Sequence, residues 1–292
     1  MQYKSGAAFR RALEVRLLTQ SFQSGVPLVR LRKLVAFDRF LARLLVDQPG
    51  QWILKGGLAL QLRIGSRART TKDMDLLNLS GADNLGEMLS MAGRIDLGDW
   101  FAFEIDSQPT PLPEEARSVR YPIHSLLDGR EFESFHVDIA VVDPVISPAD
   151  VLMTPPILAF AEIPPTSIPC YPLPQHLAEK VHAYSRLYID RENSRVKDLV
   201  DILLIAQENR LDAGLLYRSI QETFAVRQTH PLPSILPEPP SSWSLPYRKL
   251  AGEVGLSEDD LEAGFAKASR FINPILTGQD SGKWDPERQF WE

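Results

Sequence analysis

The stretch LKGGLALQLRIGSRARTTKDMDLL, residues 54–77, combines residue types that phosphate chemistry uses. Gly56 and Gly57 stand before a short helical pattern; glycine lets a ligand approach the backbone, and the free N–H groups of a helix start bind anions. If Asp73 and Asp75 lie on a strand, alternation puts both carboxylates on one face. Such a pair needs a cation between its members, and Mg²⁺ is bound by one or two carboxylates together with substrate phosphates. The stretch therefore predicts a metal-dependent phosphoryl-transfer site.

A third carboxylate is expected from FESFHVDIAVVD. Phe135, Val137 and Ile139 alternate with His136 and Asp138, so Asp138 projects from a strand opposite the apolar row. An exposed aspartate on a half-solvated strand is the alternative, although strand interiors are depleted in aspartate. A D-x-D pair alone is a weak signal, and the Gly-Lys-Ser/Thr ending of a P-loop is missing. Two glycines, a short helix and D-x-D on a strand are together more specific and indicate the nucleotidyltransferase superfamily.

Composition is that of a soluble globular protein, with 44% hydrophobic and 24% charged residues among 292. We see no apolar run long enough to span a bilayer and no secretion signal at the start, so we expect a cytoplasmic protein without a membrane partner. Cys170 is the single cysteine, which excludes an internal disulfide and a cysteine-based metal cluster.

Charge is distributed unevenly along the chain. Residues 1–72 carry 14 Lys/Arg and three acidic residues, a balance of +11, whereas the remaining 220 residues have a balance of −17. A basic segment on an acidic body suggests a face that meets phosphate, and Arg30, Arg32 and Arg39 are the expected RNA-binding residues. Equally, these arginines can solvate two amphipathic helices or pair with acidic residues of the same chain.

Periodicity divides the chain into a sheet domain and a helical domain. Helices are predicted over 7–22, 28–47, 56–63 and 84–92, and strands over 52–55, 74–77, 101–105 and 132–142. This order indicates an α/β domain with basic N-terminal helices over 1–146. After nine prolines between 144 and 174, helices are predicted over 175–188, 195–207, 211–227 and 257–273, the last with Ser257 as N-cap. Residues 147–292 are therefore expected to form a mainly helical domain.

Four segments in this order, LKGGLALQLRIGSRARTTKDMDLL, HVDIAV, QHLAEKVHAYSR and RVKDLVDILLI, resemble the AbiEii-type nucleotidyltransferase toxin family, most of all its mycobacterial MenT-like branch. The resemblance implies a bilobed α/β enzyme, with a nucleotidyltransferase-type mixed sheet domain followed by a mainly helical one. It implies Mg²⁺-dependent transfer of a nucleoside monophosphate from an NTP, a pyrimidine nucleotide in this branch, to the 3′ end of tRNA. The modified tRNA cannot be aminoacylated, which makes the enzyme toxic, and an antitoxin is encoded nearby.

Carried over by position, the functional residues of the family fall on Lys55, Gly56, Gly57, Asp73, Asp75, Lys180 and Asp201. Leu58 departs from the pattern, because many members have Ser or Thr after the glycines. Asp201 lies within LVDILLI, where a buried carboxylate needs a partner, and Lys180, Arg195 and Lys197 are candidates. A structural ion pair between two helices is the alternative. The resemblance alone makes Lys180 a ligand of the triphosphate.

Two threonines precede the aspartates, and in some MenT-like members a hydroxyl at this place is phosphorylated by the antitoxin. Thr71, two residues before Asp73, is therefore the expected regulatory site, with Thr70 second. A phosphate adds about −1.5 to −2 charge, which would oppose binding of an anionic substrate beside the carboxylates. Alternatively, both threonines only shape the turn before the strand.

Two other functional classes were compared with the RNA-directed enzyme. A small-molecule nucleotidyltransferase of the antibiotic-adenylating kind shares the first motif, but the basic segment 1–72 favours a polyanionic acceptor. A non-catalytic nucleotide- or RNA-binding protein gains nothing from three like charges at Asp73, Asp75 and Asp138. The sequence therefore predicts a toxin that transfers nucleotides to RNA.

Overall fold

The structure, a computed structural model, describes residues 3–81, 83–106, 108–111, 118–140, 148–187 and 192–292. These residues form two compact units. The first runs to Arg63 and continues over 70–140 and 149–171, and the second combines Ile64–Arg69 with Pro172–Glu292. The expected domain boundary between 146 and 147 lies outside the described residues.

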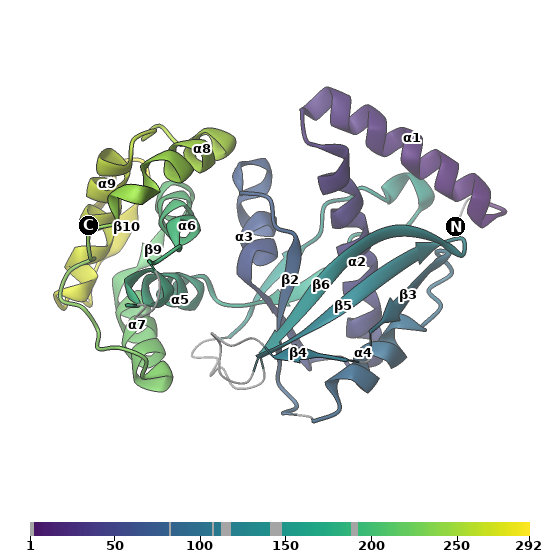
Figure 1. Ribbon diagram of the computed structural model, residues 1–292, viewed down its shortest axis with the longest axis horizontal. Helices are drawn as coiled ribbons and strands as arrows, with labels where there is room; N and C mark the ends of the chain where they lie inside the picture. The colour runs from purple at the N-terminus through teal and green to yellow at the C-terminus, as the bar shows by residue number, and fades with distance from the viewer. Residues whose placement is uncertain (1–2, 82, 107, 112–117, 141–147, 188–191) are drawn as a thin grey trace. The chain divides into compact units, whose positions relative to one another are not determined.

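A mixed sheet forms the centre of the first unit (Figure 1). Its strands are β1 (Trp52–Lys55), β2 (Asp73–Asn78), β3 (Phe101–Ile105), β4 (Thr110–Pro111), β5 (Ser118–Leu127), β6 (Arg130–Ala140), β7 (Asp150–Met153) and β8 (Ser167–Cys170). The order is β3-β5-β6-β2-β1-β8-β7, with β4 paired to β5. β2 runs parallel to β6 and β1 parallel to β8, while the other pairs are antiparallel. The predicted mixed α/β class is confirmed.

Helices cover this sheet and complete its hydrophobic core. They are α1 (Gly6–Ser24), α2 (Leu28–Asp47), α3 (Gly56–Ile64) and α4 (Leu85–Gly93), with the 3₁₀ turn η2 (Ala159–Ala161). α2 packs against β6 and α4, and α4 packs against β3. The ring of Phe135 on β6 meets those of Phe37 and Phe40 on α2, with centroids 4.9 and 5.9 Å apart. Such edge-to-face contacts add to the free energy gained by apolar burial.

β5 is a ten-residue strand that the sequence analysis did not predict. It pairs with β6 through a hairpin whose turn residues, Asp128 and Gly129, have φ angles of 53° and 67°. An Asp-Gly turn with two positive φ angles matches the twist of antiparallel strands, so this dipeptide was the available signal. The strand carries Arg120, which lies opposite Asp138 on β6.

The second unit is mainly helical (Figure 1). Its elements are η1 (Gly65–Arg67), α5 (Leu173–Ser185), α6 (Val196–Glu208), β9 (Leu211–Asp212), α7 (Ala213–Arg227), η3 (Ser241–Trp243), α8 (Ser244–Val254), α9 (Leu261–Leu276), β10 (Lys283–Asp285) and β11 (Phe290–Trp291). α6 packs against α5, α8 and α9, and its residues 198–206 are all buried. α6 is therefore the central helix of this unit, which explains its almost uninterrupted apolar sequence.

Ser257, the predicted N-cap of the last helix, is not the N-cap. In addition, α8 and the short strands β9–β11 are elements that were not predicted. The N-cap of α9 is Asp260, whose side chain accepts a hydrogen bond of 2.9 Å from the Ala263 N–H, whereas Ser257 binds Glu258 instead. Asp260 caps the helix because three residues separate it from a free N–H of the first turn.

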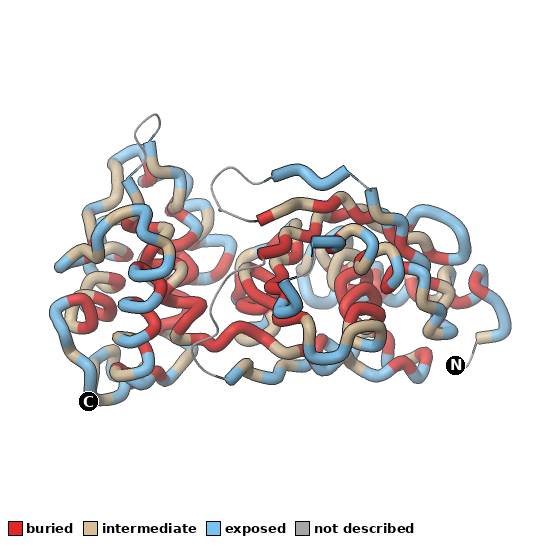
Figure 2. The backbone as a smooth tube through the Cα atoms, turned by 90° about the horizontal axis from the view of Figure 1, so that it is seen from below, coloured by how far each residue is buried: buried red, intermediate tan, exposed pale blue. Residues whose placement is uncertain are grey.

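Each of the two units has its own buried interior. Figure 2 shows buried residues along the interior elements of each unit and exposed residues at many of the turns. Among the described residues, no helix combines the length and the apolar character that a membrane crossing requires.

Candidate functional site

Four charged side chains form a row across the sheet of the first unit. Asp75 on β2 lies opposite Asp138 on the parallel strand β6. On the outer sides, Lys55 of β1 lies opposite Asp75, and Arg120 of β5 lies opposite Asp138. Opposite residues of paired strands have Cβ atoms about 5 Å apart on one face. Two neighbouring carboxylates therefore lie between two cations.

Asp73 stands two residues before this row, on the same face of β2. Both aspartates are partly exposed, while Met74 and Leu76 between and after them are buried. This alternation confirms the predicted strand geometry. His136 on β6 lies opposite Asp73, and its Nδ1 is 3.2 Å from Asp73 Oδ1.

Asp138 is held by Arg120 through two hydrogen bonds. Nε and Nη2 of Arg120 each donate to one oxygen of Asp138 at 2.7 Å, and Nη2 lies 3.5 Å from Asp73 Oδ2. The hydrogen bond to Asp138 raises the pKa of Arg120 above its ordinary value despite partial burial, and the charges of the aspartates act in the same direction. Arg120 was missed in the sequence because β5 was missed.

The start of α3 lies against Asp75. β1 ends at Lys55 and α3 begins at Gly56, whose φ angle is +64°. A Cβ atom on Gly56 would overlap the Asp75 carboxylate, so this position requires glycine for its backbone angle and for space. Lys55 is buried, with Nζ 5.1 Å from the centre of the Tyr171 ring. Leu58, the residue that departs from the family pattern, is buried in the hydrophobic core.

The donor set suits a hard divalent cation in part. Asp73 and Asp75 supply oxygen ligands from one face, and Gly56 leaves room for the Asp75 carboxylate beside the helix start. Both oxygens of Asp138 are engaged by Arg120. In the part of the chain that is described, no group of three or more His, Cys, Asp and Glu residues is arranged to hold a metal ion. The three-carboxylate site stays a prediction.

A second charged cluster lies in the helical unit, around Asp201. This carboxylate is 0% exposed, accepts from Lys180 Nζ at 2.6 Å and accepts three contacts of 3.0–3.1 Å from Arg69. Lys180 also donates to Asp198 at 3.2 Å. Of the partners expected for Asp201, Lys180 is observed, whereas Lys197 is exposed to solvent. Arg69 was not foreseen because 132 residues separate it from Asp201.

Both ends of the Lys180–Asp201 pair remain charged. Burial by itself raises the pKa of Asp201, but the charges of Lys180 and Arg69 and their hydrogen bonds outweigh it and hold the pKa below its ordinary value. Burial likewise lowers the pKa of Lys180, but the charges of Asp201 and Asp198 reverse this and raise it. A carboxylate with a lowered pKa and no exposure is suited to orienting a lysine rather than to accepting a proton.

The two threonines before β2 differ in accessibility. The hydroxyl of Thr71 is largely buried and donates to the Asp73 carbonyl at 2.9 Å, whereas Thr70 is exposed. The hydrogen bond has the geometry of a hydroxyl that shapes the entry to a strand.

The arginines expected to bind RNA are engaged within the chain. Arg39 is 5% exposed, and its guanidinium pairs with Asp38 at 2.6 Å and Asp99 at 3.5 Å. The prediction that Arg39 contacts RNA is therefore wrong, because its charge is consumed in the interior. Arg32 donates to the Phe132 carbonyl at 2.9 Å, and Arg30 is half-buried.

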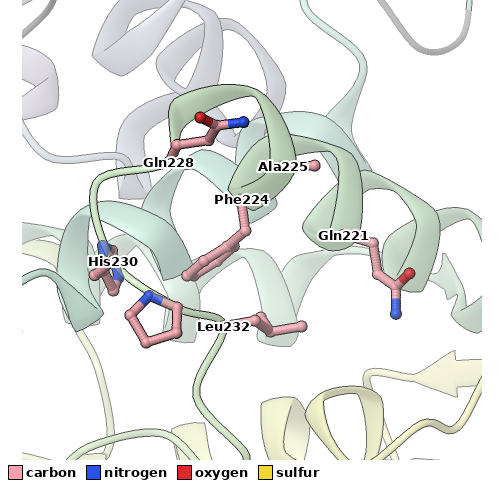
Figure 3. A pocket seen from close by; sticks show the side chains of 7 residues that line it. Gln221, Phe224, Ala225, Gln228, His230 and Leu232 are labelled. Carbon is pink, nitrogen blue, oxygen red and sulfur yellow. The ribbon is translucent and has the colours of Figure 1, made fainter.

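One hollow of the helical unit contains none of the predicted site residues. Figure 3 shows it beside α7, lined by Phe224, Gln228, His230 and Leu232 among others. Its volume is about 520 Å³. His230 Nε2 lies 2.9 Å from the Ser185 hydroxyl. His230 Nδ1 lies 2.9 Å from the Thr229 hydroxyl, so both ring nitrogens of His230 have partners within the unit, and we assign the hollow no catalytic role.

Comparison with solved structures identifies the fold. The nucleotidyltransferase toxin MenT4 of Mycobacterium tuberculosis H37Rv is similar over 89% of this chain and 97% of that one, with a TM-score of 0.55 and 18% identity. A protein of H. pylori with a nucleotidyltransferase designation is similar over 84% of this chain and 93% of that one, with a TM-score of 0.46 and 16% identity. No curated protein matches the sequence significantly. The likeness to MenT4 shows a nucleotidyltransferase fold.

The family follows from the sequence match. The profile described as "Nucleotidyl transferase AbiEii toxin, Type IV TA system" matches residues 39–271, which is most of the chain. The chain therefore belongs to the AbiEii nucleotidyltransferase toxin family. As a type IV toxin it is a nucleotidyltransferase, and membership implies a nucleotide substrate and an antitoxin partner.

Proposed function

We propose that this toxin transfers a nucleoside monophosphate from an NTP to the 3′ end of tRNA in a Mg²⁺-dependent reaction in the cytoplasm, and so blocks aminoacylation. The observation that carries this proposal is the position of Asp73 and Asp75 on one face of β2, with Asp75 against the glycine that starts α3. Carboxylates beside a helix start provide ligands for a cation and N–H donors for a phosphate at one place.

Each residue of the sheet site has a role in this proposal. Asp73 and Asp75 would hold Mg²⁺, which would supply positive charge to the transferring phosphate. The backbone N–H groups after Gly56 would bind a phosphate of the NTP, and the positive charge of Lys55 would favour that binding. Because Leu58 is buried and offers no hydroxyl, the backbone donors carry more of this binding than in relatives with Ser or Thr.

The cluster in the helical unit supports a role in binding the triphosphate. Lys180 carries a charge that Asp201 and Asp198 hold in one place. A positioned cation of this kind stabilises the charge that develops on a transferring phosphate. We infer that Lys180 contacts the nucleotide and that Asp201, itself without exposed surface, orients Lys180.

The function is tested by incubating the purified chain with total tRNA, Mg²⁺ and each α-labelled NTP in turn. We expect label at the 3′ end of tRNA from one pyrimidine NTP. Asp73→Asn and Asp75→Asn should each reduce labelling by a factor of 100 or more, on the order of the loss of a metal-ligand interaction. Glu104→Gln, at an exposed residue of β3 in the same sheet, is the matched control and should keep full activity. Label on an aminoglycoside but not on tRNA would reject the RNA acceptor.

Phosphorylation of the Thr70–Thr71 pair is the regulation that we propose. Thr71 is next to the metal carboxylates in sequence, but its hydroxyl is buried and bonded, so a kinase reaches Thr70 without opening the turn. Phosphate at either residue would place negative charge where the NTP must bind. Intact-mass and fragment analysis after co-expression with the neighbouring antitoxin gene tests this proposal. Inactive protein with no added phosphate on either threonine would contradict it.

A further inference from the structure

Arg120 occupies both oxygens of Asp138, the carboxylate that the sequence analysis expected to be a third metal ligand. The two hydrogen bonds of 2.7 Å join residues directly opposite each other on β5 and β6. Two-point pairing between a guanidinium and a carboxylate is strong and geometrically fixed. Arg120 therefore fixes the orientation of the Asp138 carboxylate and uses one lone pair of each oxygen, so a metal ion at Asp138 would compete with Arg120 for this carboxylate.

Arg120 also places a permanent positive charge beside Asp73. Its Nη2 lies 3.5 Å from Asp73 Oδ2 and 2.7 Å from Asp138 Oδ2. A guanidinium cannot lose its proton in a protein, so this charge is present at every working pH. A divalent ion at Asp138 would lie a few ångströms from a like charge, and repulsion would oppose its binding.

The row of charges is balanced without any ion at Asp138. Lys55 and Arg120 stand at its two ends, and Asp75 and Asp138 lie between them. Asp73, in the neighbouring position of β2, carries the negative charge that remains. Arg120 Nη2 is closer to Asp138 (2.7 Å) than to Asp73 (3.5 Å), so its charge mainly balances Asp138, and a divalent ion is expected on the Asp73–Asp75 side, where Mg²⁺ needs only one or two carboxylates.

We propose that Arg120 takes the place of a second divalent cation in this site: it holds Asp138, and a single ion is bound by Asp73 and Asp75. This inference rests on the proposed function of the same site. Asp138 is then a positioning residue that orients Arg120, and Arg120 is a fixed positive charge beside the ion.

Direct binding of Mn²⁺ to the purified full chain, without nucleotide, tests the proposal through the spectroscopic signal of the free ion. We expect one ion per chain. Asp73→Asn should weaken binding by about tenfold or more, as loss of a ligand does, while Asp138→Asn should change it less than about twofold.

Removal of Arg120 should strengthen Mn²⁺ binding, whereas removal of Asp73 should weaken it. Arg120→Gln releases Asp138, so we expect Mn²⁺ to bind about threefold or more tightly, or a second ion to bind, on the order of outer-shell effects. Arg11→Gln removes one exposed positive charge from α1 and controls for net charge; it should leave Mn²⁺ binding unchanged. Circular dichroism verifies that each variant is folded.

Three results would overturn the proposal: two ions on the wild-type chain, weakening by Asp138→Asn as large as by Asp73→Asn, or unchanged Mn²⁺ binding in Arg120→Gln. Absence of any Mn²⁺ binding would also overturn it. The tRNA-labelling assay is separate, because Mn²⁺ binding without nucleotide needs no substrate. Failure of labelling with the expected Mn²⁺ results would reject the proposed function and keep the assignment of Arg120.

Discussion

Asp201 and Lys180 show at the residue scale how burial separates a structural role from a chemical one. Removal of Asp201 leaves Lys180 and Arg69 buried without their shared counter-charge, whereas removal of Lys180 leaves Asp201 paired with Arg69. Breaking a buried pair from one side costs about 3–5 kcal/mol. Asp201→Ala should therefore lose more stability than Lys180→Ala.

Both variants should lose nucleotide transfer, and denaturant unfolding at pH 7.5 ranks their stabilities. Lys197→Ala, an exposed lysine on the same helix, is the control and should keep stability and activity. Equal destabilisation by Lys180→Ala and Asp201→Ala would show that Arg69 does not compensate for the missing lysine.

His182 contributes to the pH dependence of the free energy of unfolding. Burial lowers the pKa of His182 to about 3, and His230, Arg227, Arg186 and Arg195 act in the same direction. The unfolded chain binds the proton near pH 6.5, so His182 contributes stability that is complete above that pH and is lost as the pH falls towards 3. Between pH 6.5 and 4.5 the loss is about 2–3 kcal/mol.

Urea unfolding at pH 7.5 and pH 5 measures this effect. His182→Gln should be less stable than wild type at pH 7.5, because it loses packing against Phe224 and the contact with Thr229, but its stability should fall less between the two pH values. Some acid sensitivity persists, since burial also lowers the pKa of His230. His124 is exposed, and His124→Gln should follow the wild-type pH dependence. If the free energy of unfolding of His182→Gln fell as much between pH 7.5 and pH 5 as that of the wild type, this account would be contradicted.

At the scale of elements, the junction of β1 and α3 depends on one glycine. Gly56 has a φ angle of +64°, and a Cβ atom there would overlap Asp75; Gly50, before β1, has a φ angle of +77° with nothing near its Cβ position. Alanine at either position carries the backbone strain, about 1–2 kcal/mol. Only at position 56 must the Asp75 carboxylate also move.

Comparison of Gly56→Ala with Gly50→Ala isolates that movement. We expect both variants to unfold at lower denaturant concentration, and only Gly56→Ala to lose Mn²⁺ binding and nucleotide transfer. Full activity in a folded Gly56→Ala protein would show that the carboxylate does not need its place against α3.

At the scale of the whole molecule, seven arginines of the basic segment 1–72 are hydrogen-bonded within their own chain. Side-chain bonds to carbonyl or side-chain oxygen atoms are made by Arg10, Arg32, Arg39, Arg43, Arg63, Arg67 and Arg69. Arg11 and Arg16 on α1 are exposed and form no ion pair within the described residues. They line a groove of about 960 Å³ with Phe160, and Arg16 lies over that ring.

If tRNA is the acceptor, Arg11 and Arg16 are better candidates for backbone contacts than the buried arginines. Arg11→Gln combined with Arg16→Gln should reduce the dependence of log Kd on log salt by about one to two, because each phosphate contact releases roughly one counterion. The side chain of Arg32 is already bonded to the Phe132 carbonyl, so Arg32→Gln should leave this slope unchanged. An identical salt slope in the double variant would exclude this part of α1 from the RNA-binding surface.

The sequence by itself determined the elements whose geometry depends on near neighbours. The order β1–α3–β2 and the shared face of Asp73 and Asp75 follow from glycine positions and from alternation within a few residues. The apolar row on β6 likewise predicted that Asp138 faces away from the core. These features can be predicted without knowledge of the rest of the chain, because the alternation of side chains along a strand depends only on neighbouring residues.

The tertiary structure decided which charge meets which. Arg120 binds Asp138 because the β5–β6 hairpin brings residues 18 apart into register, and Arg69 binds Asp201 across 132 residues because the fold of the second unit brings the segment before β2 to the buried face of α6. Arg39 was expected at the surface and is buried with Asp99. Arginine and aspartate have the same local propensities whether exposed or paired, so no sequence period distinguishes the two states. Pairing energy depends on distance and burial, and these exist only once strands and helices have packed.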